Sequence, residues 1–306
     1  MTSPPHRNQT ISFLSRRFAE VGIRPDARRG QNFLIDLNLL RILVDAAELG
    51  PDDVVLEVGG GTGSLTALVA ERAAAVVTVE IDAALAQLHR EELVGATNVT
   101  LLEQDALKNK NQLAPEVLAA VREALAVPGR HFKLVSNLPY NVATPVISNL
   151  LAGEPVPDLM VVTIQKELAD RITARPSTKD YSALSLWVQC QCEVEVVRLL
   201  PPTVFWPRPK VESAILRIVV DRQRRAQIAD IEFFHRFVRA VFLHRRKFLR
   251  GVLLAAFKQL SKPQVDAIMT RLGLGSDARA EQLDVATMQT LAEAVAAELA
   301  ASEPAV

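Results

Sequence analysis

Four consecutive residues, Asn137-Leu138-Pro139-Tyr140, combine an amide, a turn former and an aromatic ring in a way that suits the handling of a planar base. The amide oxygen of Asn137 can accept a hydrogen bond from an exocyclic amine, and a backbone carbonyl beside Pro139 can accept a second. The ring of Tyr140 can stack on the base. Without further context, a strand that ends in a proline turn, with Tyr140 in the core, explains the same residues.

A glycine-rich turn lies upstream of this loop. The apolar run Val54–Val58 predicts a buried strand, and it is followed by Gly59-Gly60-Gly61-Thr62-Gly63 and a helix-like segment, 64–70. A strand, a glycine turn and a helix open a nucleotide-binding βαβ unit, in which glycines let the backbone approach a ligand. A dinucleotide fingerprint needs a glycine at the sixth position, where Ser64 stands, and no Lys-Ser or Lys-Thr pair follows to make a P-loop.

Two carboxylates follow the next two predicted strands. The strand 76–80 ends in Glu80, about twenty residues past the glycines, where a carboxylate usually binds ribose hydroxyls. The strand 99–103 leads to Asp105, which can accept a hydrogen bond from an adenine amino group. Because the carboxyl ends of parallel strands line one crevice, these groups and the Asn137 loop should meet there. The set suits a cradle for S-adenosylmethionine that faces an amine-gripping loop.

Several further segments occur in a fixed order along the chain. They are Gly30-Gln31-Asn32-Phe33-Leu34, the glycine turn, the Asn137 loop, Phe205-Trp206-Pro207-Arg208-Pro209-Lys210-Val211-Glu212-Ser213, and His244-Arg245-Arg246-Lys247-Phe248-Leu249-Arg250. Together they resemble the small-subunit ribosomal RNA adenine dimethyltransferases, the KsgA family. The resemblance covers about residues 28 to 290.

The resemblance implies roles for individual residues. Tyr140 would lie under the target adenine, with Phe205 on its other face, and Asn137 would contact both the adenine and the methyl donor. The other implied donor contacts are Asn32, Leu34, Gly59, Gly61, Glu80 and Asp105. The basic residues implied to bind RNA are Arg245, Arg246, Lys247 and Arg250.

The chain departs from the family pattern in a few places. A proline is more usual where Gly60 stands, so the turn should be slightly looser here. The segment 108–130 is longer than expected, and its helix-like part, 115–126, is expected at the surface. Tyr181-Ser182 stands where Tyr-Gly is more usual, which concerns a local turn rather than the site.

The implied activity is S-adenosylmethionine-dependent dimethylation of the N6 amines of two adjacent adenines, in a hairpin loop near the 3′ end of small-subunit ribosomal RNA, with a role in subunit assembly. The reaction is an in-line displacement that needs no metal, and positioning can supply about 7 to 11 kcal/mol of such a barrier. Three alternatives stand beside it. They are a large-subunit RNA methyltransferase of the antibiotic-resistance type, a non-catalytic ribosome-assembly factor, and an NAD-dependent oxidoreductase, for which Glu80 would serve equally well.

Charge is unevenly distributed although the net charge is zero. Between Arg222 and Leu260 there are ten Lys or Arg against Asp230 and Glu232, and the balance reverses after Leu260. The 245–247 cluster lies among apolar residues, a pattern that predicts a helix with one buried and one cationic side. Such a stripe can bind RNA phosphates locally. A solvated helix face is the alternative.

Composition agrees with a cytoplasmic enzyme, and we expect a monomer. Hydrophobic residues make up 49% of the chain, yet there is no apolar run of the length that spans a membrane. The only cysteines, Cys190 and Cys192, are too few for a structural zinc site and are expected to be free thiols. The arginine-bearing start faintly resembles a transit peptide, but Ile11, Leu14 and Phe18 give a helix an apolar face, and such a helix is expected to fold over the donor site.

The organisation that follows is an α/β, Rossmann-like S-adenosylmethionine-dependent methyltransferase domain with a smaller C-terminal helical domain. Residues 1–29 form an N-terminal arm or helix, 30–221 the methyltransferase domain and 222–306 a helical RNA-binding domain. Later strands are predicted at 159–164, 193–199 and 214–220. The last two are joined by a proline-rich loop, and the resemblance implies that they form an antiparallel hairpin.

Overall fold

The computed structural model describes residues 11–20, 22, 23, 25 and 30–302. The chain forms two compact units, Met1–Ala169 with Val194–Val219, and Asp170–Glu193 with Val220–Val306. The segment 170–193, which the sequence pattern places in the methyltransferase domain, therefore groups with the C-terminal helices. Of the expected N-terminal arm, residues 1–10, 21, 24 and 26–29 lie outside the described residues.

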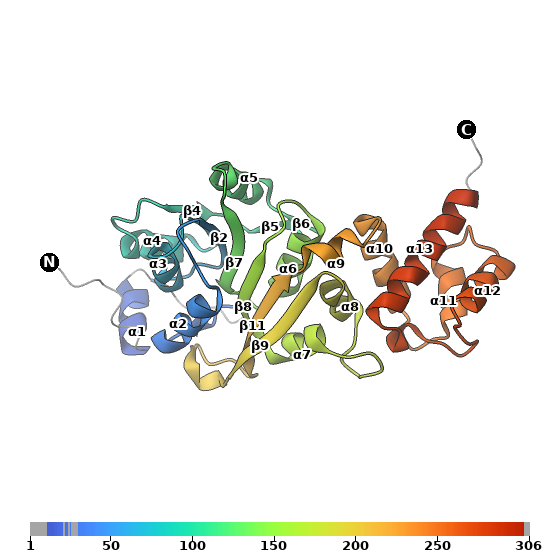
Figure 1. The fold of residues 1–306 in the computed structure, drawn as a ribbon. Coiled ribbons are helices and arrows are strands. Elements are labelled where there is room, and N and C mark those ends of the chain that lie inside the picture. The colour runs from blue at the N-terminus through green and yellow to red at the C-terminus, as the bar shows by residue number, and fades with distance from the viewer. Residues whose placement is uncertain (1–10, 21, 24, 26–29, 303–306) are drawn as a thin grey trace. The chain divides into compact units, whose positions relative to one another are not determined.

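A seven-stranded sheet with the order β4-β3-β2-β7-β8-β11-β9 is the centre of the first unit (Figure 1). The first five strands in this order are parallel, and β11 pairs antiparallel with β8. The strands are β2 (Asp53–Val58), β3 (Ala75–Glu80), β4 (Val99–Glu103), β7 (His131–Asn137), β8 (Leu159–Gln165), β9 (Cys192–Leu200) and β11 (Ser213–Val220). The chain leaves β2 toward β3 on one side and returns to β7 on the other, which makes the β2/β7 boundary the topological switch point.

Each predicted strand forms within one residue of its expected bounds. The central strands are continuous apolar runs because helices cover both of their faces. All six residues of β2 are buried, including the carboxyl-bearing Asp53 and Glu57. The predicted α/β class is confirmed.

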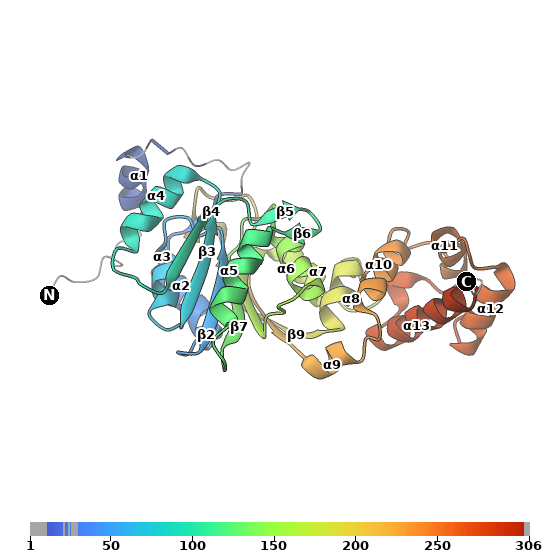
Figure 2. The same ribbon diagram turned by 90° about the horizontal axis from the view of Figure 1, so that it is seen from above.

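Helices pack on both faces of the sheet. Helices α2 (Leu37–Ala46) and α3 (Ser64–Ala70) share one core cluster with alternate strand residues such as Val55 and Val135. Helix α5 (Pro115–Leu125) packs on β2 and β3 from the other face (Figure 2) and buries Val117 and Val121 completely. The helix lies at the surface, as expected, with residues such as Glu116 and Arg122 exposed, but its inner face is part of the core. It is the crossover that a parallel β4-to-β7 connection requires.

Several shorter elements complete the first unit. The N-terminal α1 (Ile11–Glu20) buries Leu14 and Phe18 against Leu85 and Leu88 of α4 (Ala83–Glu92). Strand β1 (Phe33–Leu34) pairs antiparallel with β10 (Phe205–Trp206). The remaining elements of this unit are β5 (Leu107–Asn109), β6 (Gln112–Leu113), α6 (Ala143–Ala152) and the 3₁₀ turn η2 (Pro202–Val204).

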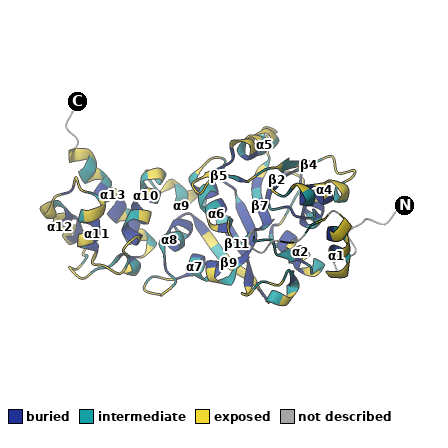
Figure 3. Ribbon diagram, turned by 180° about the vertical axis from the view of Figure 1, so that it is seen from behind, coloured by how far each residue is buried: buried dark blue, intermediate teal, exposed yellow. Residues whose placement is uncertain are grey.

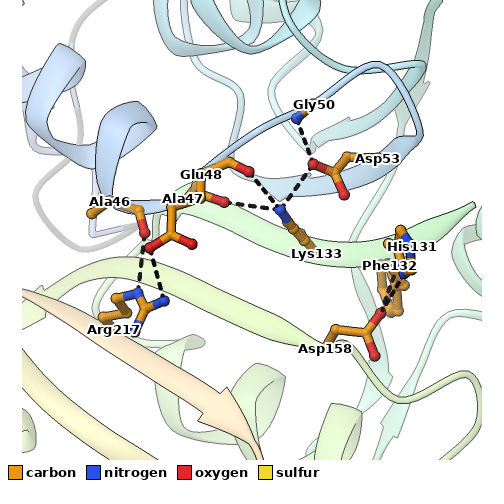
Figure 4. Close-up of polar contacts among 10 residues, drawn as sticks. All are labelled: Ala46, Ala47, Glu48, Gly50, Asp53, His131, Phe132, Lys133, Asp158 and Arg217. Carbon is orange, nitrogen blue, oxygen red and sulfur yellow. Dashed lines mark hydrogen bonds and ion pairs between the residues drawn. The ribbon is translucent and has the colours of Figure 1, made fainter.

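Polar ties hold the amino-terminal edge of the sheet to the end of α2 (Figure 4). The ammonium of Lys133, at the start of β7, donates to the carbonyls of Ala47 and Glu48 and forms a 2.8 Å ion pair with Asp53. Arg217 of β11 donates to the Ala46 carbonyl and pairs with Glu48 at 3.1 Å. The Lys133–Asp53 pair is mostly buried and Lys133 has further hydrogen-bond partners, so it fixes this edge, whereas the exposed Arg217–Glu48 pair contributes less.

The second unit is helical. It contains the end of α7 (Lys166–Thr173), α8 (Ala183–Gln189), α9 (Arg222–Ala226), α10 (Ile231–Phe242), α11 (Leu249–Ala256), α12 (Lys262–Arg271), the 3₁₀ turn η3 (Ala280–Gln282) and α13 (Val285–Ser302). Helices α10 and α13 each carry both buried and exposed residues (Figure 3), and Phe237 and Leu291 are among those in the core. Cys190 and Cys192 are buried free thiols, as predicted. Over the described part of the chain, no helix combines the length and the apolar character that crossing a membrane requires.

Candidate functional site

A cavity of about 420 Å³ opens at the carboxyl ends of β2, β3 and β7, at the switch point of the sheet. Six predicted site residues line it: Asn32, Gly59, Gly61, Glu80, Asp105 and Asn137. The structure adds residues that the sequence did not single out, namely Gln31, Phe33, Ile81, Leu85, Gln104, Asn141 and Val142. Glycines, carboxylates and amides from distant segments therefore converge on one space.

Glu80 ends β3 with its side chain almost completely buried. One carboxylate oxygen accepts the backbone N–H of Gly61 at 2.8 Å, and the other accepts that of Asp82 at 2.9 Å. Burial raises the pKa of Glu80 above its ordinary value, and the backbone N–H donors oppose that rise. Each oxygen keeps a lone pair, so Glu80 can fix the glycine turn and still accept hydroxyl groups of a ligand.

Asn137 ends β7 and holds the opposite side of the cavity. Its side-chain NH₂ donates to the backbone carbonyl of Asn32 at 3.0 Å. This bond fixes the orientation of the amide and leaves the Oδ1 oxygen as an acceptor on a residue that lines the cavity. The side chain of Asn32 in turn donates to the Gly30 carbonyl at 3.2 Å.

Close backbone contacts bring three chain segments together around the cavity. Gly59 has a positive φ of 81°, and a Cβ placed on it would lie 2.7 Å from the ring of Pro139. Gly30 has a φ of 70°, and a Cβ there would lie 3.0 Å from the backbone nitrogen of Tyr140. Only glycine combines this conformation with this proximity. The two glycines thus explain how the 30–34 segment and the glycine turn both pack on the Asn137 loop.

The third wall of the cavity follows β4. Asp105 is exposed, and its Oδ1 accepts the backbone N–H of Leu107 at 2.9 Å. Beside it, the side-chain nitrogen of Gln104 is buried and has no hydrogen-bond partner among the described residues. A buried donor without a partner is costly, so this position favours a ligand that brings an acceptor.

Three residues with implied roles lie outside the cavity wall. Phe205 and Leu34 are buried in the core cluster shared by α2 and α3, where their strands pair as β10 and β1. Tyr140 is half-buried beside the cavity, and its hydroxyl lies 2.6 Å from the Ser213 hydroxyl. Burial raises the pKa of Tyr140, so the phenol is neutral at physiological pH. In this conformation Tyr140 flanks the cavity, whereas Phe205 does not reach it.

Gly60 does not line the cavity. Side chains pack closely against it, although the sequence suggested a slightly looser turn here. A Cβ at this position would lie 2.3 Å from His89 and 2.4 Å from the Thr78 hydroxyl. Both belong to a buried polar cluster with Glu57 and Thr66. Burial raises the pKa of Glu57 to about 7 and lowers the pKa of His89 to about 4. A carboxyl inside the apolar run of β2 was the one sequence signal of this cluster.

Three features of the cavity fit S-adenosylmethionine. The glycine turn leaves no room for side chains where the backbone faces the space, Glu80 offers acceptors for ribose hydroxyls, and Gln104 offers an unused donor. The residues that would hold the donor are Asn32, Gly59, Gly61, Glu80, Asp105 and Asn137.

The predicted basic helix is a turn. Helix α10 ends at Phe242 and α11 begins at Leu249, so Arg245, Arg246 and Lys247 lie between two helices. Arg245 donates to the carbonyls of Tyr181 and Lys179 and pairs with Glu281. Arg250, in α11, makes a two-bond ion pair with Asp266 at 2.5 and 2.8 Å.

The remaining residues of this turn are exposed. No side-chain hydrogen bond or ion pair joins Arg246 or Lys247 to the residues that the structure describes. Phe248 is 54% exposed, and the guanidinium of Arg279 lies 5.6 Å from the centre of its ring. Arg245 therefore anchors a turn that presents Arg246, Lys247 and Phe248 to solvent.

Comparison with known proteins gives matches over most of the chain. The family model described as ribosomal RNA adenine dimethylase matches residues 25–297. A curated relative, ribosomal RNA small subunit methyltransferase A of Alkaliphilus metalliredigens, is 38% identical over 269 residues, which is 88% of this chain and 91% of the relative.

Two solved structures share the fold. A dimethyladenosine transferase from Plasmodium falciparum is 24% identical with a TM-score of 0.68, and the match covers 84% of this chain and 94% of that one. The 23S rRNA methyltransferase ErmE is 27% identical with a TM-score of 0.61, covering 87% of this chain and all of that one. The match of the family model over nearly the whole chain decides the assignment: this protein belongs to the ribosomal RNA adenine dimethylase family.

Proposed function

We propose that this protein transfers methyl groups from S-adenosylmethionine to the N6 amines of two adjacent adenines in small-subunit ribosomal RNA. The observation that carries the proposal is Asn137. Its NH₂ is held by the Asn32 carbonyl, which leaves its carbonyl oxygen free to accept at the cavity. The family and the name of the curated relative support the small subunit as the target.

S-adenosylmethionine supplies an electrophilic methyl carbon on a positively charged sulfur. Glu80 would accept hydrogen bonds from ribose hydroxyls while it also accepts the one from the Gly61 backbone N–H. Asp105 would accept a hydrogen bond from the amino group of the donor's own adenine. The glycine turn lets the backbone approach without side chains between it and the ligand.

Asn137 would accept a hydrogen bond from one N–H of the target amine. This bond would orient the amine so that its nitrogen lone pair points at the methyl carbon of the donor instead of being delocalised into the adenine ring. Tyr140 would support the base by stacking, a contact worth about 1 to 3 kcal/mol. Phe205 would reach the base only if the β10 segment opened, because its ring is in the core. After methyl transfer the amine loses its proton to water, so no strong base is needed.

RNA contact is proposed for the α10–α11 turn. Arg246 and Lys247 are exposed cations whose side chains have no partner among the residues that the structure describes, and Phe248 offers an exposed ring to an unstacked base. Arg245 and Arg250 are assigned to holding the turn and α11 in place, because their guanidinium groups are already paired. The 222–306 domain as the RNA-binding part is proposed on the same grounds.

The proposal extends to the setting of the reaction. We expect a monomer that acts in the cytoplasm on the immature small subunit, as the family resemblance implies. Light scattering on the purified protein tests the monomer, and binding to mature and immature subunits tests the preferred substrate.

Large-subunit RNA is the second candidate substrate, because ErmE is 27% identical over 87% of this chain. The deciding experiment supplies the purified protein and labelled donor with undermethylated small and large subunits, and maps dimethyladenine by mass spectrometry. We expect two adjacent dimethyladenines in small-subunit RNA and none in large-subunit RNA. Label in large-subunit RNA alone would replace the first candidate with the second, and RNA binding without any transfer would favour a non-catalytic assembly factor.

A further inference from the structure

A buried polar cluster lies on the side of the glycine turn that does not line the cavity. Glu57 of β2 accepts hydrogen bonds from the hydroxyls of Thr66 in α3 and Thr78 in β3, the latter at 3.0 Å. The Thr66 hydroxyl also lies 2.9 Å from Nε2 of His89 in α4. All four side chains are buried. The cluster thus joins the strand before the turn, the helix after it, the neighbouring strand and the helix that follows Glu80.

The His89 ring is in direct contact with the turn. A Cβ on Gly60 would lie 2.3 Å from its Cε1 atom, and a Cβ on Gly63 would lie 2.9 Å from its Cδ2 atom. Gly59 and Gly61, in contrast, line the cavity. Alternate glycines therefore face opposite ways, two toward the cavity and two toward the imidazole.

The hydrogen-bond directions within the cluster are determined by the chemistry of its members. Glu57 as a carboxylate can only accept, so both threonine hydroxyls donate to it. Thr66 has then used its single proton, and His89 must donate its Nε2–H to the Thr66 oxygen. The other ring nitrogen, Nδ1, has no hydrogen-bond partner among the described residues, which fits a bare lone pair better than a second N–H.

We infer that His89 is a positioning residue for the methyl donor: its buried imidazole supports the glycine turn and, through Thr66, ties that turn to Glu57. Nothing in the cluster touches the cavity, so it acts through the backbone at Gly60 and Gly63. The conformation of that backbone sets where Gly61 meets Glu80 and where Gly59 meets Pro139.

Two matched pairs of variants test the inference, with donor affinity measured by calorimetry in the absence of RNA. Thr66→Val keeps the shape of threonine without its hydroxyl, and Thr66→Ser keeps the hydroxyl. His89→Leu keeps bulk without a donor, and His89→Gln keeps an N–H near the position of Nε2. We expect Thr66→Val and His89→Leu to weaken donor binding about tenfold, the effect of one lost hydrogen bond, and the two conservative variants to stay within about threefold.

Thermal unfolding separates the loss of the hydrogen bond between Thr66 and His89 or Glu57 from a general loss of stability. Val265→Ala, in the buried core of α12, is the control for a less stable protein with an intact turn. It should lower the melting temperature and leave donor affinity unchanged. If Thr66→Val does not fold, the His89 pair decides alone.

The pH dependence of donor affinity is a readout that a filler residue would not alter. The other charged groups that face the cluster are Glu80 of β3 and Arg90 of α4, and α3 has none. With Glu57 titrating near pH 7, donor binding should tighten as the pH rises through that value, because the anion holds both hydroxyls more strongly. Thr66→Val removes a hydrogen bond that lowers the pKa of Glu57, so the inflection should move to higher pH.

Two results would overturn the inference. One is unchanged donor affinity in both Thr66→Val and His89→Leu at a normal melting temperature. The other is His89→Gln binding as weakly as His89→Leu with an inflection identical to that of the wild type, since the imidazole would then only fill space.

Discussion

At the scale of single residues, Glu80 has two tasks that a ribose-binding carboxylate need not have. It accepts the N–H groups of Gly61 and Asp82, so its loss removes two charge-assisted bonds and releases the turn. We expect Glu80→Ala to weaken donor binding by about a hundredfold and Asp105→Ala by only a few-fold, since bonds to charged groups are worth about 1.5 to 3 kcal/mol each. Calorimetry with both variants measures the difference, and equal losses would show that the turn does not depend on Glu80.

Tyr140 and Asn137 should separate binding from chemistry. Tyr140→Ala should leave donor affinity unchanged and cut methyl transfer by about fivefold to a hundredfold, the range expected for one lost stacking contact. Tyr140→Phe is the matched control, because it removes only the hydrogen bond to Ser213 and keeps the ring. Asn137→Ala should damage both steps, since it also loses the bond to the Asn32 carbonyl. Full turnover in Tyr140→Ala would place the ring in the core alone.

The sequence predicted those site residues that stand directly after strands, because strand ends meet at one edge of a parallel sheet. It could not predict Phe33 or Gln104, whose roles depend on how loops pack across the cavity. The same holds for His89, which reaches Glu57 through Thr66 across a strand, a turn and two helices. The role of Phe205 at the base stays a prediction, because its motif implies that role while its strand pairing places the ring in the core in this structure.

At the scale of elements, neighbouring arginines at the α10–α11 turn differ in their contacts: Arg245 and Arg250 have partners within the protein, whereas Arg246 is exposed to solvent. Replacing Arg246 and Lys247 with Gln should weaken RNA binding and reduce the slope of log affinity against log salt by about 0.7 to 0.9 for each lost phosphate contact. Arg250→Gln should leave the slope unchanged, because its guanidinium is paired with Asp266. The measurement is RNA affinity at several salt concentrations, with donor affinity as a control.

Parallel lines for the wild type and the Arg246/Lys247 double variant would contradict this assignment. The phosphate contacts would then have to come from other arginines. Arg245→Gln serves a separate purpose: it should lower the melting temperature, since the anchor of the turn is lost.

Apolar strands and the glycine turn were predictable because each is a local pattern. The interruption of the basic helix was not, since residues 243–248 contain neither glycine nor proline to signal it. It coincides with the bonds of Arg245 to Tyr181 and Lys179, more than sixty residues away in sequence. Likewise, the length of segment 108–130 suggested an addition, whereas α5 is needed to cover β2 and β3.

At the scale of the whole molecule, the buried cluster should shape stability against pH. The pKa of Glu57 is raised from 4.5 to about 7, so its contribution to stability is complete below pH 4.5 and is lost as the pH rises through 7. The pKa of His89 is lowered from 6.5 to about 4, so its contribution is present above pH 6.5 and is lost as the pH falls through 4. The two trends oppose each other, which favours an intermediate optimum.

Melting temperatures between pH 4 and 8 test this. Relative to wild type, Glu57→Gln should gain stability as the pH rises from 5 to 8, because the variant has no charge to bury. His89→Gln should gain on wild type as the pH falls from 6.5 to 4. Curves that stay parallel to the wild type would mean that neither group titrates in this range.

The amino-terminal edge of the sheet offers a site for attaching a label. Lys133 and Arg217 contact that edge at the end of the strands away from the cavity. The turn 126–130 before β7 is open there: apart from Gly129 and its chain neighbours, no described residue has an atom within 4 Å of the position that a Cβ on Gly129 would take. Exposed turns of this kind tolerate insertions. A short cysteine-bearing insertion that carries a fluorophore at this turn should therefore leave methyl transfer at the wild-type rate.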